Sequence, residues 1–148
     1  MKEAIYTVIL LFVLTSVSCQ TKTDFVKVDK SKINKEQFEL VKNLTNKILT
    51  EQKDGGYYSL SDSEATDQMI EGLSESVQKE SYGTIKNLFG DYEDLNFESL
   101  MESTDENKYK IYRFKGNFAT SSDVEVRAVL NKEGKLAGFY IKPWNEKL

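Results

Sequence analysis

Carboxylates and tyrosines are the side chains through which this chain could do chemistry. The 148 residues contain Asp+Glu 24, Tyr 8, Cys 1 and His 0. Without histidine the chain cannot form a Ser-His-Asp triad, a Cys-His pair or an imidazole metal site. The formal net charge of −4 argues against nucleic acid as a partner, because surfaces that bind nucleic acid are basic.

Neighbouring carboxylates occur at four places in the sequence. The groups are Asp62/Glu64, Asp91/Glu93/Asp94, Glu98/Glu102 and Asp105/Glu106. General acid–base catalysis needs two carboxyl groups in a cleft with separated pKa values, whereas acidic neighbours in turns and on strand exteriors are usually solvated. The segment 91–94 also lacks the ligand spacing of a calcium loop. We therefore predict no catalytic residue, no metal site and no cofactor.

The aromatic residues permit two interpretations. A tyrosine paired with a carboxylic acid can polarise a carbonyl group without histidine, provided that an open cavity holds both side chains. The rings can instead fill the core, with some hydroxyl groups reaching its rim. We favour packing, and we predict a candidate binding rim formed by Tyr112, Tyr140 and Trp144.

The first residues read as an export signal. Lys2 is followed by an almost entirely apolar run over residues 4–14, which is too short to span a bilayer. The segment Val17-Ser18-Cys19 resembles the cleavage site of bacterial lipoprotein signals, whose cysteine becomes the lipidated first residue. That resemblance implies a signal peptide at 1–18, lipidation of Cys19 and export to the cell envelope. Gln20 after the cysteine favours the outer membrane.

The rest of the chain divides into a polar tether and a single domain. Residues 19–32 are lysine-rich and predict a flexible tether, and residues 33–148 predict one folded domain. Asn34 and Gln37 predict the start of a helix that ends at Asp54-Gly55-Gly56. The apolar residues of this helix recur at steps of three and four: Phe38, Val41, Leu44 and Ile48.

Two further helices are expected before residue 90. Ser61 and Glu64 form the pattern of a capping box, which predicts a short helix interrupted at Gly72. A third helix is expected over residues 74–89, and Gly90 is suited to a left-handed C-cap. Its expected buried residues are Val77, Ser81, Ile85 and Leu88.

After residue 90 the hydrophobic period changes from 3.6 to 2, which indicates strands. Four strands are expected, near residues 95–102, 108–118, 124–130 and 135–142. In the second strand the alternation slips, which indicates either a strand covered on both faces or a bulge. The sequence therefore predicts an α+β fold with N-terminal helices packed on a four-stranded antiparallel sheet.

Several segments carry a resemblance to a known family. They are Ser81-Tyr82, Leu88-Phe89-Gly90-Asp91-Tyr92, Tyr112-Arg113-Phe114-Lys115-Gly116 and residues 131–144 with their ending Lys142-Pro143-Trp144. Residues 38–144 resemble the bacterial domain of unknown function 3887, which has a cystatin-like or nuclear-transport-factor-like cone fold. The resemblance implies a curved sheet wrapped around a long helix, and it transfers no catalytic residue.

Two functions are compatible with these features. We favour an envelope-anchored, non-catalytic accessory or interaction module that holds an unknown protein, peptide or glycan partner. The alternative is a small-ligand binder or weak cone-fold enzyme. A cavity of about 300 Å³ or more inside the cone, lined by a tyrosine and a carboxylate, would exclude the interaction module and favour this alternative.

Overall fold

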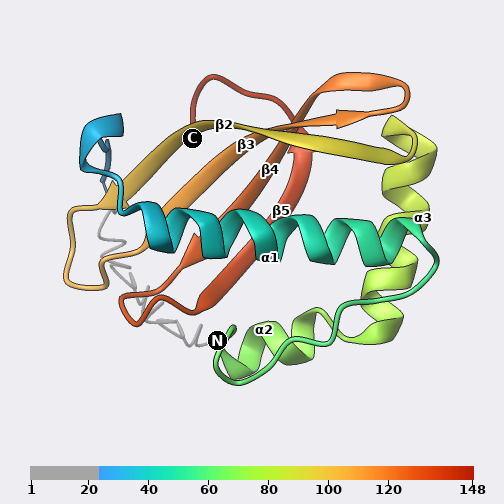
Figure 1. Ribbon diagram of the computed structural model, residues 1–148, viewed down its shortest axis with the longest axis horizontal. Coiled ribbons are helices and arrows are strands. Elements are labelled where there is room, and N and C mark those ends of the chain that lie inside the picture. The colour runs from blue at the N-terminus through green and yellow to red at the C-terminus, as the bar shows by residue number, and fades with distance from the viewer. Residues whose placement is uncertain (1–23) are drawn as a thin grey trace, which may run out of the picture.

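The computed structural model describes residues 24–148 and places helices against one face of an antiparallel sheet (Figure 1). The predicted signal peptide and Cys19 lie outside these residues. The elements are β1 (Phe25–Lys27), the 3₁₀ helix η1 (Lys30–Lys32), α1 (Lys35–Lys53), α2 (Asp67–Gly72), α3 (Glu75–Phe89), β2 (Tyr92–Ser103), β3 (Lys110–Phe118), β4 (Ser121–Leu130) and β5 (Leu136–Pro143). The predicted α+β class with an antiparallel sheet is confirmed.

The sheet has five strands in the order β1-β2-β3-β4-β5, and every neighbouring pair is antiparallel. The expected number of four is therefore wrong. The additional strand is β1, in which Phe25 pairs with Ser103 and Lys27 with Met101. Part of the expected tether at 19–32 thus belongs to the sheet. A three-residue strand is too short to show alternation, and it forms because β2 offers unpaired backbone groups.

Helix α1 forms as the sequence predicts. The Asn34 side chain accepts a hydrogen bond of 2.9 Å from the Gln37 backbone N–H, which caps the first turn. The helix lies across one face of the sheet, which we call the inner face (Figure 1). Its buried residues are Val41, Thr45, Ile48, Leu49 and Gln52.

The expected capping box closes a turn and does not begin a helix. The Glu64 carboxylate accepts hydrogen bonds from the Ser61 backbone N–H at 3.0 Å and from the Ser61 hydroxyl at 2.8 Å. Helix α2 begins later, with Thr66 as its N-cap, and ends at Gly72. Ser61 and Glu64 are therefore hydrogen bonded to each other, but the prediction that they begin the helix is wrong.

Helix α3 has the expected bounds but a different buried face. Gln78 and Tyr82 are buried, whereas Val77 and Leu88 are exposed. The Gln78 amide donates to the backbone carbonyls of Tyr58 at 2.8 Å and Leu73 at 2.6 Å. Gln78 therefore supplies hydrogen-bond donors to backbone carbonyls of the chain between α1 and α3. A search of the sequence for an apolar stripe does not detect such a buried polar residue.

The inner face of the sheet supplies most of the core. Phe97 of β2 lies between Phe38 of α1 and Phe114 of β3, at ring distances of 4.9 and 5.9 Å. Strand β3 is buried continuously from Ile111 to Phe114, so both of its faces are covered. Register shifts occur in the β2–β3 pairing at Tyr92/Asp94 and Phe97/Ser99, and in the β3–β4 pairing at Gly116/Phe118. The alternation slips between Ile111 and Tyr112, where the register is regular, so coverage of both faces explains it.

Candidate functional site on the outer face of the sheet

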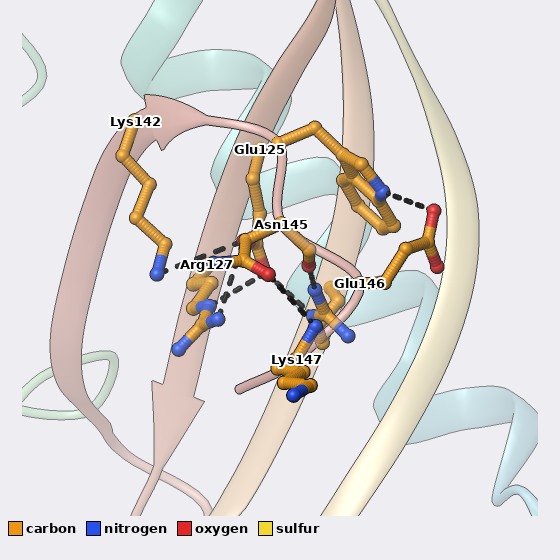
Figure 2. A network of polar contacts seen from close by, with 8 residues as sticks. Glu125, Arg127, Lys142, Asn145, Glu146 and Lys147 are labelled. Atoms are coloured by element: carbon orange, nitrogen blue, oxygen red, sulfur yellow. Dashed lines mark hydrogen bonds and ion pairs between the residues drawn. The ribbon is translucent and has the colours of Figure 1, made fainter.

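The opposite face of the sheet, which we call the outer face, contains a buried charged network centred on Glu125. The Glu125 side chain is 0% exposed. Its Oε1 accepts hydrogen bonds from Nε of Arg113 at 2.5 Å and Nε of Arg127 at 2.6 Å, and its Oε2 lies 3.8 Å from Nζ of Lys142 (Figure 2). Strands β3, β4 and β5 each contribute to this network. The register pairs Arg113 with Arg127 and Glu125 with Lys142.

The last residues of the chain cover one side of this network. The Trp144 ring lies 4.6 Å from the Arg113 guanidinium and 4.9 Å from Nζ of Lys115. Arg113 also donates a hydrogen bond to the backbone carbonyl of Asn145, and Trp144 Nε1 donates to Glu146 at 2.8 Å. The Arg113 side chain is consequently only 6% exposed. Residues 144–148 therefore form a covering segment, which we call the C-terminal tail.

Glu125 is held in its ionised form. Burial alone raises the pKa of this carboxyl group, but the hydrogen bonds and charges of Arg113 and Arg127 have the larger combined effect and lower it. Three cationic side chains thus share one carboxylate, and Lys115 lies beside it in the register. We call these four residues the cation cluster: Arg113, Lys115, Arg127 and Lys142. The cluster carries excess positive charge on a chain of net charge −4. Lys115 and Lys142 are its partly exposed members, whereas the side chains of Arg113 and Arg127 are only 6% and 12% exposed.

Two of the three predicted rim residues lie at this face. Tyr140 is 55% exposed and pairs with Arg127 across β4 and β5. Its ring lies over Gly138, where a Cβ atom would be 3.0 Å from the ring. Trp144 is partly exposed over the cation cluster.

Tyr112 does not lie on a rim, contrary to our expectation. Its side chain is fully buried on the inner face, and its hydroxyl donates to Gln37 at 3.1 Å. Burial, together with the charge of Glu102, raises the pKa of Tyr112 to about 12. The physical reason is its position in a central strand, where alternation places it beside Phe114 against α1.

The sequence analysis missed the residues at the centre of this face. It assigned no role to Arg113, Glu125 or Arg127. One signal could have identified them, because coverage of both faces of β3 was one of the two explanations offered for its slipped alternation. Charged residues in and beside such a strand must pair with each other to be buried.

Two tyrosine–carboxylate pairs also occur, and neither suits carbonyl polarisation. The Tyr58 hydroxyl donates to Glu64 at 2.7 Å, and the Tyr82 hydroxyl donates to Asp91 at 3.0 Å. Burial raises the pKa of Glu64, but hydrogen bonds from Tyr58 and Ser61 lower it overall. Hydrogen bonds from Lys86 and Tyr82 lower the pKa of Asp91. A carbonyl-polarising pair needs a protonated acid and a free phenol, and these pairs have the opposite arrangement.

A groove of about 520 Å³ runs between α3 and β5. Its lining residues are Gln52, Leu73, Glu80, Ser81, Thr84, Ile85, Phe139, Tyr140, Ile141 and Lys142. It therefore reaches the size that we set for a ligand cavity, and it includes a tyrosine and a carboxylate. In the described residues, however, Tyr140 and Glu80 share no hydrogen bond, and the register places Tyr140 on the outer face.

Gln52 brings an unsatisfied acceptor to this groove. Its Nε2 donates to Gln78 Oε1 at 3.3 Å, while its own Oε1 is buried without a partner. The orientation is fixed because Gln78 Oε1 already accepts from the Tyr58 N–H at 3.0 Å and therefore requires a donor from Gln52. A bound molecule with a hydrogen-bond donor could satisfy this atom.

Comparisons with protein-family models, curated proteins and solved structures found no match to this chain. The resemblance to the domain of unknown function 3887 family therefore stays a prediction. Within residues 24–148, no group of three or more His, Cys, Asp or Glu side chains is arranged to hold a metal ion. None of the helices in that range is both long and apolar enough to cross a bilayer.

Proposed function

We propose that this protein is a non-catalytic interaction module of the cell envelope, which binds an acidic partner through the outer face of its sheet. Export and a lipid on Cys19, at the outer membrane, would hold the domain at that location. The observation that carries the proposal is the cation cluster, in which Arg113, Arg127 and Lys142 share the single carboxylate of Glu125.

The arrangement supports binding rather than catalysis. Glu125 neutralises only part of the positive charge, and the Lys142 side chain remains 39% exposed beside Tyr140. An aromatic surface next to incompletely neutralised cations supplies contact area and attracts carboxylates. The side chains of Arg113 and Glu125 are held rigidly by their hydrogen bonds, so this surface is already organised before a partner binds.

The proposal can be tested with an acidic probe and the natural fluorescence of the chain. Trp144 is the only tryptophan, so its emission reports on this face. We expect polyglutamate to change that emission, with an affinity that falls steeply as the salt concentration rises. The double variant Lys115→Gln/Lys142→Gln should bind roughly tenfold more weakly.

A matched control removes the same charge elsewhere. Lys35→Gln/Lys42→Gln alters α1, which packs on the inner face, and should leave polyglutamate binding unchanged. Equal weakening by both double variants, or binding insensitive to salt, would contradict the proposal. Binding of a carboxylated polysaccharide in place of polyglutamate would show that the partner is a glycan.

We also propose the cone fold and the family resemblance as the finer description of this chain. The support is an antiparallel meander whose inner face is crossed by the long helix α1 (Figure 1).

A second function, binding of a small neutral ligand, is favoured by one observation. The unpartnered Gln52 Oε1 lies at an apolar groove and would accept a hydrogen bond from an alcohol or amide. The test is a screen of such compounds by NMR. A ligand of this kind should shift the side-chain amide signal of Gln52 in the wild-type protein.

A further inference from the structure

We propose that the partner is an extended peptide with alternating apolar and acidic residues, which adds to the free edge of β5 as a sixth strand. This inference rests on the proposed function and specifies the chemistry of the acidic partner. It follows from three properties of one strand: its unpaired edge, the groove on its inner side and the cation cluster on its outer side.

The backbone at the edge of β5 is only partly used by the chain itself. Leu136 donates to the Glu64 carbonyl at 2.8 Å and accepts from the Thr66 N–H at 2.9 Å. These bonds form a short parallel bridge between Ala65 and Leu136. In the described residues, the edge from 138 to 142 has no backbone partner other than β4. An added strand would supply those missing hydrogen bonds.

The inner side of the same edge offers space for apolar side chains. The groove between α3 and β5 follows residues 139–142 of this edge, and Phe139 and Ile141 form the apolar part of its β5 wall. Leu73 and Ile85 form the apolar part of the opposite wall. A peptide lying along β5 would direct every second side chain into this groove.

The outer side of the edge selects the remaining side chains by charge. Side chains of an added strand that alternate with the buried ones would lie beside Tyr140 and Lys142, with Arg127 in the next strand. The positive charge at this face is complementary to acidic residues. The opposite edge of the sheet is a poorer template, because β1 contains only three residues.

The experiment uses the full chain and three peptides of about ten residues. The first alternates Ile and Glu, the second has the same composition in blocks, and the third carries N-methyl groups on alternate backbone nitrogens. We expect the alternating peptide to bind roughly tenfold more tightly than either control, as measured by fluorescence anisotropy. Backbone amides in residues 138–142 that point away from β4 should exchange more slowly in its complex, because they become hydrogen bonded.

Three variants separate the groove from the charged face. Ile85→Glu places a charge in the groove and should weaken binding of the alternating peptide roughly tenfold without affecting polyglutamate. Lys142→Glu should weaken both probes. Leu88→Glu makes the same kind of change at an exposed position of α3 and should affect neither. The N-methyl peptide lacks alternate backbone N–H donors and therefore tests hydrogen bonding to the β5 edge with the wild-type protein. This conclusion does not depend on the folding of a variant.

The outcomes distinguish this inference from the proposed function. If polyglutamate binds but alternation brings no gain in affinity and exchange at 138–142 is unchanged, strand addition is wrong, while the proposed binding of an acidic partner at the cation cluster is retained. A further peptide, in which Lys replaces every Glu of the alternating sequence, tests the charge: if it binds as tightly as the Ile-Glu peptide, the assigned charge of the partner is wrong. If neither acidic probe binds, the proposed function itself is wrong.

Discussion

Glu125 illustrates how a polar position of a strand becomes part of a buried interior. On an uncovered sheet this side chain would face water, but the guanidinium groups of Arg113 and Arg127 and the C-terminal tail enclose it. A buried ion pair contributes modestly in net terms, because desolvation offsets much of the attraction. Removing one partner is far more costly, since the remaining charges stay buried without compensation.

We therefore expect Glu125→Gln to lower the free energy of unfolding by about 3–5 kcal/mol. The neutral amide would leave Arg113 and Arg127 without a carboxylate while keeping nearly the same volume. Urea denaturation measures the change. The control is Glu133→Gln in the exposed hairpin turn, which should alter stability by less than about 0.5 kcal/mol. Equal effects of the two substitutions would show that the network is not stabilising.

The lowered pKa of Glu125 predicts that the free energy of unfolding depends on pH in the acidic range. The pKa of Glu125 is lower in the folded protein than its ordinary value of 4.5, so its ionisation favours folding. This contribution is complete above about pH 4.5 and is lost as pH falls through the folded pKa. The difference in unfolding free energy between wild type and Glu125→Gln should therefore narrow on acidification. Denaturation curves that differ by a constant amount at every pH would contradict the assignment.

At the scale of elements, the junction between α3 and β2 depends on a single glycine. Gly90 has φ +85° and ψ −170°, a conformation that is accessible essentially to glycine. Gly90 therefore ends α3 with a positive φ, but the expected left-handed C-cap is wrong, because ψ lies outside the left-handed helical region. The turn between β3 and β4 packs closely here, and a Cβ atom at Gly90 would lie 2.9 Å from the Cβ of Ala119.

Substitution by alanine should have opposite effects at two glycines of this region. Gly90→Ala should destabilise the protein by at least about 1–3 kcal/mol, because it adds both backbone strain and a steric clash. Gly83→Ala lies inside α3 with nothing within 4 Å of the added methyl group. It should stabilise the protein by about 0.5–1 kcal/mol through helix propensity. Thermal unfolding measures both, and a neutral Gly90→Ala variant would exclude this account of the junction.

At the scale of the whole molecule, both ends of the described chain complete the sheet. Strand β1 extends one edge, and the C-terminal tail crosses from β5 over the outer face toward β2 (Figure 1). The tail joins the sheet through a hydrogen bond of 2.9 Å from Trp144 N–H to the Asp123 carbonyl. Its contacts with Arg113 convert an exposed strand face into a partly closed one.

Deletion of residues 144–148 should therefore open the network to water. Arg113 would lose the Asn145 carbonyl and the Trp144 ring, and we expect a loss of about 2–3 kcal/mol in unfolding free energy. Removal of Leu148 alone should cost less than about 0.5 kcal/mol, because its side chain is largely exposed. Chemical denaturation of both truncations provides the measurement. Equal stability of the longer truncation and the wild type would mean that the tail does not support the site.

The sequence determined the features that depend on local periodicity and local capping. The change from a 3.6-residue to a 2-residue period indicated the α+β class and the order of helices before strands. Asn34 indicated where α1 begins, because an N-cap acts on backbone groups only two or three residues away. The sequence also indicated that β3 departs from simple alternation, and it placed Tyr140 and Trp144 near the end of the last strand.

Only the tertiary structure decided which polar residues are buried and which face of each element is covered. Gln78 on α3, Tyr112 on β3 and Glu125 on β4 owe their burial to segments far away in the sequence. The same holds for β1, whose pairing with β2 joins residues about 75 positions apart. Periodicity describes how a segment alternates, but coverage of its second face depends on the remainder of the chain. For that reason the cation cluster and the groove beside β5 emerge only from the folded molecule.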